Sequence, residues 1–462
     1  MSTKAFAALR DLLGPSGFLS GEDVPVRNRR DCSATPASTP LAVMRPASVQ
    51  EVAAVIRICA EHHLPVVPQG GMTGLSGGAV ARSDQLALST ERLRGIEALD
   101  GDTILVRAGT PLAEVHEAAA GIGMTFPIDI GSRGSCSIGG MAATNAGGYR
   151  VIRHGMMRRQ VLGLEAVLAD GTVVSSLRPM LKDNAGFDVK QLFIGSEGCL
   201  GVVTRVLLQL IPASSEQAMA LIGARDYAAA LACLASARRN LGVRLSAFEG
   251  IWPDYWDLMR ERLPDRTVPL AGRHGIYLLV EMQGNEGDRS AMEGWLAECL
   301  ADPRVEDGVV AFSDTQVAAL WTLREGLDEF WPAAAPYGHV SFDVGVRPAD
   351  IDRFISRCRK EIGAIAGATA LFFGHIGDGN VHVVIGLPGD DPLAAKAHIE
   401  TLVYGAIADF TGTVTAEHGV GQLKRRWLEF SRSPAEIEVM RRLKTALDPY
   451  GLFNPGKVLP DP

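Results

Sequence analysis

The chain has 462 residues, more than one ordinary hydrophobic core holds, which favours two or three domains. Hydrophobic residues make up 47% and charged residues 21% of the composition, as is typical of a folded globular protein. The net charge of −8 argues against a nucleic-acid-binding protein, which normally carries a basic surface. No apolar run approaches the roughly 18 residues of a membrane span, and we expect no secretory signal at the N-terminus.

The seven cysteines are scattered singly, without a CxxC pair. An odd and dispersed set of cysteines indicates reduced thiols, so we expect a cytoplasmic protein without disulfides. Ordinary packing is the expected role for most of these side chains.

The first half of the chain alternates predicted helices and strands. A helix is expected from Val49, because Ser48 and Glu51 form the pattern of a capping box. The apolar segment 64–68 predicts a buried strand that ends at a glycine-rich loop. Further predicted elements follow in order: strands at 85–89 and 103–109, a helix at 112–120, and strands at 161–174 and 201–210.

The glycine-rich loop is a candidate phosphate site. Backbone N–H groups on such a turn can converge on a pyrophosphate without any charged side chain. A flexible surface loop is the alternative, but the apolar strand that leads into the loop favours a cofactor site. A second cluster of small residues, 131–148, also allows close backbone approach to a ligand.

Two nucleotide-binding motifs are excluded by their context. No G-x-G-x-x-G stands between a strand and a helix, so a Rossmann dinucleotide site is not predicted. Residues 451–457 match the GxxxxGK part of the P-loop motif, but Val458 replaces the Ser or Thr that the motif requires. No helix is expected after this segment.

The second half of the chain holds all six tryptophans and a cluster of potential metal ligands. His375, His382, Glu417 and His418 supply imidazoles and a carboxylate, a suitable ligand set for one divalent transition metal. Zinc fits these nitrogen and oxygen ligands, and manganese, cobalt or iron could replace it. A buried, hydrogen-bonded histidine is the alternative for His382 alone.

These segments together resemble a known family. The segments 68–74, 137–140, 145–148 and 195–201 are similar to FAD flavoproteins of the vanillyl-alcohol oxidase type. The metal cluster and the segment 454–457 resemble the D-2-hydroxyacid dehydrogenase branch, which includes D-2-hydroxyglutarate and D-lactate dehydrogenases.

The resemblance implies an α+β fold with a two-subdomain FAD-binding domain of the vanillyl-alcohol oxidase (PCMH) type and an α+β cap domain. The predicted boundaries are 1–214 for the FAD domain, 215–440 for the cap and metal domain, and 441–462 for a tail that returns to the FAD domain. The glycine loop has no histidine to attach a flavin, so non-covalent FAD is implied.

The implied FAD contacts come from loops spread over the first domain and the C-terminal tail. They are Pro68, Gln69, Gly70, Gly71, Met72, Thr73, Gly74, Leu75, Gly77, Gly78, Pro127, Ser135, Ser137, Ile138, Gly139, Gly140, Thr144, Asn145, Gly147, Gly148, Glu197, Gly198, Gly201, Val202, Val203 and Asn454.

The resemblance also implies a mechanism. His375, His382 and Glu417 hold the metal, which acidifies the substrate hydroxyl, and His418 is the base. The hydride passes to the flavin. Arg324 grips the substrate carboxylate, as a guanidinium fork can do with two hydrogen bonds. Its alternative is an ion pair on a helix surface.

The match weakens at the predicted substrate positions. Ser341 and Asn380 are expected to line the substrate site, but Asp328, Ser341 and Val384 stand where the hydroxyglutarate enzymes have a threonine, a lysine and an asparagine. Another D-2-hydroxyacid is therefore an equal candidate. We further expect a homodimer that passes electrons to a carrier. The alternatives are a flavin subunit of a glycolate-oxidase-type complex, a metallohydrolase, and a nucleotide-binding module without catalysis.

Overall fold

The computed structural model describes residues 3–266, 268–270 and 272–461, and the chain divides into two compact units. The first unit comprises residues 1–148, 155–213 and 417–462, and the second comprises 149–154 and 214–416. The return to the first unit thus begins at Glu417, earlier than the predicted 441. The short segment 149–154, which was expected in the FAD domain, groups with the second unit.

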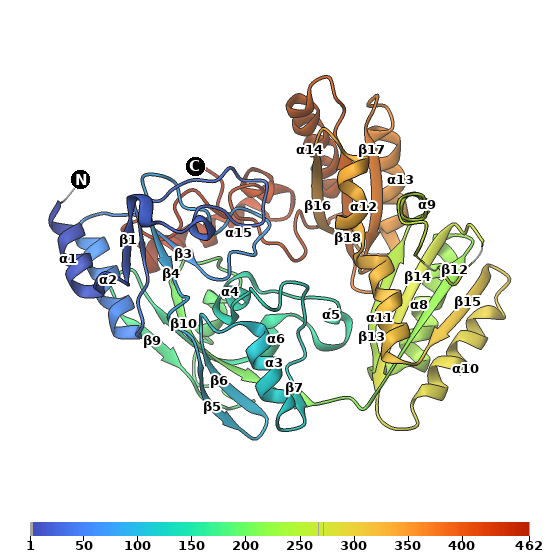
Figure 1. The fold of residues 1–462 in the computed structure, drawn as a ribbon, viewed down its shortest axis with the longest axis horizontal. Coiled ribbons are helices and arrows are strands. Elements are labelled where there is room, and N and C mark those ends of the chain that lie inside the picture. The colour runs from blue at the N-terminus through green and yellow to red at the C-terminus, as the bar shows by residue number, and fades with distance from the viewer. Residues whose placement is uncertain (1–2, 267, 271, 462) are drawn as a thin grey trace. The chain divides into compact units, whose positions relative to one another are not determined.

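The first unit contains two main sheets (Figure 1). One has the order β1-β2-β4-β3, with parallel pairing between β2 and β4 and between β4 and β3. The other is antiparallel, with the order β5-β6-β10-β8-β9. The strands are β1 (Phe18–Ser20), β2 (Ala42–Met44), β3 (Val66–Gln69), β4 (Leu86–Ser89), β5 (Ile96–Asp100), β6 (Thr103–Arg107), β8 (Val161–Val167), β9 (Val173–Ser176) and β10 (Val202–Gln209), and a small pair joins β7 (Met124–Thr125) to β11 (Ile211–Pro212).

Helices of the first unit bury apolar stripes against these sheets. Helix α2 (Val49–Glu61) begins at the predicted cap, where the Ser48 side chain accepts the N–H of Glu51. Its residues Val52 and Ile56 are fully buried in one core cluster with α1 (Thr3–Leu13). The remaining helices are α3 (Leu112–Ala120), α4 (Ile138–Thr144), α6 (Met157–Gln160), α7 (Lys190–Phe193) and α15 (Pro434–Leu447).

The second unit is built on a seven-stranded antiparallel sheet with the order β15-β12-β14-β13-β17-β18-β16 (Figure 1). The strands are β12 (Glu216–Ala224), β13 (Leu245–Ile251), β14 (Ile276–Gly284), β15 (Val305–Ala311), β16 (His339–Gly345), β17 (Thr369–Gly374) and β18 (Asn380–Gly386). The helices are α5 (Val151–His154), α8 (Tyr227–Asn240), α9 (Pro253–Arg262), α10 (Arg289–Leu300), α11 (Asp314–Glu325), α12 (Leu327–Ala334), α13 (Ile351–Ile362) and α14 (Pro392–Asp409).

Helices cover both faces of this sheet. On one face, Phe373 and Val384 belong to a core cluster with residues of α9, α11 and α12. On the other face, Phe342 packs edge-on against Tyr404 of α14, and Phe372 lies under Arg359 of α13. Because side chains alternate along a strand, His382 shares the first face with Val384, and Glu249 shares it with Ile251. The candidate site is therefore on the face covered by α9, α11 and α12.

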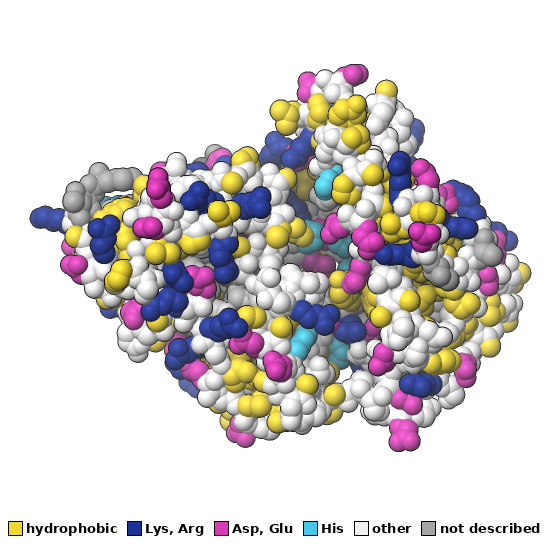
Figure 2. Space-filling view, in the orientation of Figure 1, with side chains coloured by type: hydrophobic (Ala, Val, Ile, Leu, Met, Phe, Trp, Pro, Cys, Tyr) yellow, Lys and Arg dark blue, Asp and Glu magenta, His cyan; other side chains and the backbone are white. Residues whose placement is uncertain are grey.

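The surface shown in Figure 2 mixes cationic and anionic side chains with scattered apolar ones. None of the helices in the described residues is long and apolar enough to cross a membrane. All seven cysteines are free, as the sequence predicted.

Candidate functional site

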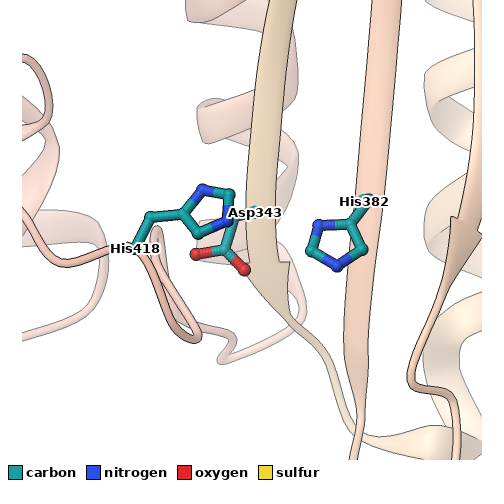
Figure 3. A group of neighbouring side chains, drawn as sticks. All are labelled: Asp343, His382 and His418. Carbon is teal, nitrogen blue, oxygen red and sulfur yellow. The ribbon is translucent and has the colours of Figure 1, made fainter. Parts of the chain in front are cut away.

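A cross-strand row of side chains brings the first candidate ligand into place. Phe373 on β17 is the register partner of His382 on β18, which in turn is the partner of Asp343 on β16. Register partners point to the same side of a sheet, so these three side chains share one face. Figure 3 shows Asp343 and His382 on their neighbouring strands, and also labels His418.

The loop after β17 folds the second histidine toward this row. Gly374 has a φ of +156°, and a Cβ at Gly374 would lie 2.5 Å from the Asn380 carbonyl, so the turn requires glycine. The ring centroids of His375 and His382 are 5.4 Å apart with an interplanar angle of 81°. The structure thus brings these two imidazoles close together within the second unit.

Glu249 connects His375 to the predicted substrate arginine. Its carboxylate is fully buried and accepts hydrogen bonds from His375 Nδ1 at 2.5 Å and from Arg324 Nε at 2.9 Å. Burial alone would raise the pKa of Glu249, but His375 and Arg324 outweigh it and hold the pKa below its usual value. A proton held on Nδ1 leaves the ring's lone pair on Nε2, the arrangement found in histidines that bind metals.

Arg324 is buried on α11, with 6% of its surface exposed. The expected alternative, an ion pair on a helix surface, is wrong, because its partner Glu249 lies inside the unit. The guanidinium also lies over the Phe373 ring, 4.4 Å from its centroid. Among the described residues its only hydrogen bond is the one from Nε, so both Nη nitrogens keep their donors for a ligand.

Two further carboxylates on this face, Asp343 and Glu281, were not predicted from the sequence. Asp343 is fully buried and accepts hydrogen bonds from Asn380 Nδ2 at 2.6 Å, Thr415 Oγ1 at 3.0 Å and the Ala416 N–H at 3.2 Å. Asn380 thus holds Asp343, and its own Oδ1 is buried without a hydrogen-bond partner.

Glu281 on β14 holds the segment 149–154 against the sheet. It accepts hydrogen bonds from Arg150 Nε at 2.8 Å, Ser246 Oγ at 2.6 Å and Trp321 Nε1 at 3.1 Å. Tyr149, the residue before Arg150, makes an edge-type ring contact with His375, with a centroid distance of 6.0 Å. No local pattern marks Glu249, Glu281 or Asp343. Arg324, His375, Arg150, Trp321 and Thr415 each lie 40 or more positions from the carboxylate that they bond.

The predicted substrate positions differ in their surroundings. Ser341 is exposed and lies opposite Val384 on the neighbouring strand, on the same face as His382. Val384 is buried in the core, and Asp328 is exposed on α12.

Within the first unit, the predicted base and the carboxylate ligand lie in a turn that is held from several sides. Glu417 Oε1 accepts the Gly148 N–H at 3.1 Å, and the His418 carbonyl accepts the Ser76 hydroxyl at 3.0 Å. Glu197 accepts the N–H groups of Val420 at 2.7 Å and Gly421 at 2.8 Å. Burial raises the pKa of Glu197, and these two N–H groups oppose the rise.

Backbone strain in the first unit concentrates at predicted FAD contacts. Seven non-glycine residues in the described chain have positive φ, and four of them are predicted contacts: Met72, Asn145, Glu197 and Asn454. Such conformations cost energy and cluster at ligand sites. In addition, Asn454 Oδ1 is buried without a hydrogen-bond partner, as expected of a group that meets a ligand.

The glycines of the two predicted FAD loops lie closely together. A Cβ at Gly70 would meet Ser137 Oγ at 2.4 Å, and one at Gly71 would meet the Ser135 carbonyl at 2.1 Å. Residues 138–144 form helix α4, with Ser137 as its cap, where the sequence suggested only an open small-residue cluster. A cavity of about 540 Å³, lined by Arg30, Asp31 and neighbouring residues up to Ala37, was not predicted. Thr35 in this lining lies close to Gly77 of the glycine loop.

Comparison with known proteins places the chain in a family. Residues 40–176 match the FAD binding domain family, and residues 213–458 match the C-terminal domain of FAD linked oxidases. The chain belongs to the FAD-linked D-2-hydroxyacid dehydrogenase family. It is 39% identical to D-2-hydroxyglutarate dehydrogenase of Xanthomonas citri pv. viticola over 430 residues, which cover 91% of this chain and 89% of that protein. It is 37% identical to the mitochondrial D-2-hydroxyglutarate dehydrogenase of Arabidopsis thaliana, with 90% of this chain and 75% of that protein covered.

The predicted fold is also confirmed. The crystal structure of p-cresol methylhydroxylase with substrate bound superimposes with a TM-score of 0.78 at 17% identity, covering 98% of this chain and 96% of that one. Both the PCMH-type architecture and the dependence on FAD therefore agree with the sequence prediction.

Proposed function

We propose that the protein oxidises a D-2-hydroxyacid to the 2-oxoacid, with non-covalent FAD as the hydride acceptor. The observation that carries this proposal is the Glu249 bridge, which fixes one nitrogen of a potential metal ligand and turns a buried arginine toward the same face. A carboxylate-binding group beside a metal-type histidine pair suits a substrate whose hydroxyl neighbours a carboxylate.

The loops around Gly70, Ser137 and Asn454 would hold the FAD. Their close backbone packing, the strained Met72 and the orphaned Asn454 Oδ1 support this assignment. When bound, FAD supplies the acceptor for the hydride of the substrate carbon. No histidine lies in the glycine loop, which supports a non-covalent flavin.

His375, His382 and Glu417 would hold one divalent metal, with zinc as the first candidate and manganese, cobalt or iron as others. The Ala416 N–H donates to the Asp343 carboxylate. Glu417 is the next residue, and its Cα lies about 4 Å from the Cα of Ala416. A set of His375, His382 and Glu417, or of Asp343, His382 and His418, has the composition of a metal site. A divalent cation there would lower the pKa of the substrate hydroxyl.

The remaining steps belong to the chain's own residues. The two Nη groups of Arg324 would bind the substrate carboxylate, while Glu249 keeps the guanidinium oriented through Nε. The side chain of His418 would accept the hydroxyl proton, since an imidazole is largely neutral near pH 7. Glu197 and Ser76, which hold the turn at 418–421, would position this base.

D-2-hydroxyglutarate is one candidate substrate, because relatives carry that name. A smaller or more apolar D-2-hydroxyacid is the other, because Val384 is buried and offers no side-chain hydrogen bond. We further propose an electron carrier as the acceptor, a homodimer and a cytoplasmic location. Membership of a glycolate-oxidase-type complex is the alternative, and co-purifying partner chains would favour it.

The test is anaerobic reduction of the purified flavoprotein by a panel of D- and L-2-hydroxyacids, followed as bleaching of the flavin absorbance. We expect D-enantiomers alone to bleach it. His418→Gln should slow the bleaching about 10²- to 10⁴-fold, the range for loss of a general base. Exposed His398 on α14 offers a matched control, and His398→Gln should leave the rate unchanged.

Three results would contradict the proposal: a colourless protein that hydrolyses its substrate, bleaching by L-acids alone, or an unchanged rate in His418→Gln. Treatment with a chelator should abolish the bleaching while the flavin colour stays. If the chelator leaves the rate unchanged, the metal assignment is wrong while the flavin assignment stands.

A further inference from the structure

The second unit has a surface cavity that the proposed oxidation does not use. It has a volume of about 400 Å³ and is lined by the end of α8, the 3₁₀ turn at Gly242–Arg244, the end of β14 and Arg153 of α5. Its lining residues all belong to the second unit. This volume is in the range of small-molecule sites, about 300 to 1,000 Å³.

The lining is strongly cationic for a protein with a net charge of −8. Three arginines, Arg153, Arg239 and Arg244, face the cavity together with a single carboxylate, that of Asp288. The lining therefore carries a formal surplus of two positive charges, three arginines minus one aspartate. Such a surplus attracts anions.

Asp288 is already counted in this surplus, and both of its carboxylate oxygens are engaged. Its Oδ1 accepts from Arg244 Nη1 at 2.8 Å, and its Oδ2 accepts the Asn285 N–H at 2.9 Å. Arg244 is also satisfied, since Nε donates to the Leu241 carbonyl at 3.2 Å and Nη2 to the Asn240 carbonyl at 3.1 Å. Arg244 and Asp288 thus form the framework of the cavity.

Arg153 and Arg239 keep most of their donors. The Arg153 guanidinium donates from Nη1 to the Gln283 carbonyl at 2.8 Å, and this side chain makes no other hydrogen bond in the part of the chain that the structure describes. The Arg239 side chain is exposed and makes no hydrogen bond to any of the described residues. Partial burial lowers the pKa of Arg153, Arg150 adds to that effect, and Glu281 opposes it. A bound anion would stabilise the charged guanidinium.

We propose that this cavity binds a phosphate monoester of a small metabolite, with the phosphate between Arg153 and Arg239. Guanidinium groups bind phosphate oxygens in pairs and are the side chains best suited to this anion. Val243, 84% exposed in the cavity lining, offers an apolar contact for the organic part of the ligand.

The test is isothermal titration of the FAD-saturated enzyme with phenyl phosphate, with phenol as the uncharged analogue. We expect one saturable site per chain for phenyl phosphate and none for phenol. Arg239→Ala should weaken binding about tenfold, the loss expected for one charge-assisted contact. Arg260→Ala, which removes an exposed arginine of α9 outside the cavity, should leave the affinity unchanged.

A second variant tests whether phenyl phosphate binds elsewhere on the protein. Arg153→Gln combined with Arg239→Ala should abolish saturable binding, with the flavin absorbance spectrum confirming an intact holoenzyme. Saturable binding of phenyl phosphate that persists in this double variant would overturn the proposal. The absence of saturation in the wild-type enzyme at millimolar concentration would overturn it as well.

Discussion

The Glu249 bridge makes a quantitative prediction about the second unit. In Glu249→Gln the side chain keeps its shape but loses its charge and one of its two strong acceptors. Arg324, with 6% of its surface exposed, would then lack a carboxylate partner. Breaking a buried ion pair on one side costs about 3 to 5 kcal/mol. We take about 3 kcal/mol, because the glutamine oxygen can still accept one hydrogen bond.

Differential scanning calorimetry of the FAD-saturated protein measures this cost. For a unit of roughly 200 residues, each kcal/mol lowers the melting temperature by about 2 to 4 °C, so we expect a drop of about 6 to 12 °C. The sign of the pH dependence follows from the lowered pKa of Glu249. Its contribution is present above the unfolded pKa of about 4.3 and is lost as the pH falls through the lower folded value. The difference between wild type and variant should therefore shrink below about pH 4.

Glu306→Gln is the matched control. Glu306 also bonds the Nδ1 of a histidine, His274, at 2.6 Å, but its side chain is 39% exposed. Exposed pairs of this kind contribute about 0 to 1 kcal/mol, so this variant should melt within about 4 °C of the wild type. Equal melting temperatures of Glu249→Gln and Glu306→Gln would refute the reasoning, because the buried bridge would then contribute no more than a surface pair.

Three further predictions concern other anchors. Arg324→Lys keeps a positive charge but loses the planar fork of the guanidinium. The KM for the hydroxyacid should therefore rise about 10- to 100-fold in steady-state assays. An unchanged KM would exclude Arg324 from the substrate site. Arg150→Met leaves the buried Glu281 with only neutral hydrogen-bond donors. Urea unfolding should therefore show the second unit destabilised by about 3 kcal/mol. A loss below about 1 kcal/mol would contradict the importance of the Arg150–Glu281 pair. Burial lowers the pKa of Lys457 to about 8. Between pH 8 and 10 the unfolded state therefore binds more protons than the folded state. The free energy of unfolding of the wild type, relative to that of Lys457→Met, should rise over that interval by roughly 2 to 3 kcal/mol. A fall would contradict the lowered pKa of Lys457.

Local signals in the sequence predicted elements well where one residue pattern decides the conformation. The helix at 112–120 has the predicted bounds, and α2 begins after Ser48 as the capping box indicated. The glycine cluster after Ser137 shows the limit of such signals. Glycine usually disfavours a helix, but the Ser137 cap and the buried Ile138 and Met141 stabilise α4 there.

The candidate site was only partly predictable, because its supporting residues are defined by distant partners. His375 and His382 are close in sequence, and glycines between them signal a turn. Glu249 lies in an apolar strand and bonds residues 75 and 126 positions away, so no local pattern identifies it. The same applies to Glu281, whose partner Arg150 lies 131 positions earlier.

The three buried carboxylates, Glu249, Glu281 and Asp343, have the same structural role. Burying a charge costs several kcal/mol, and an apolar pair of similar volume is often at least as stable, so stability is a weak reason to keep them. Each instead fixes a segment that the proposed chemistry needs. Glu249 orients Arg324 and His375, and Glu281 holds the segment that carries Tyr149. Asp343 holds Ala416, the residue before Glu417. Because all three lie on one face of one sheet, the strand register sets the spacing of these anchors, and a one-residue slip in register would turn them to the opposite face.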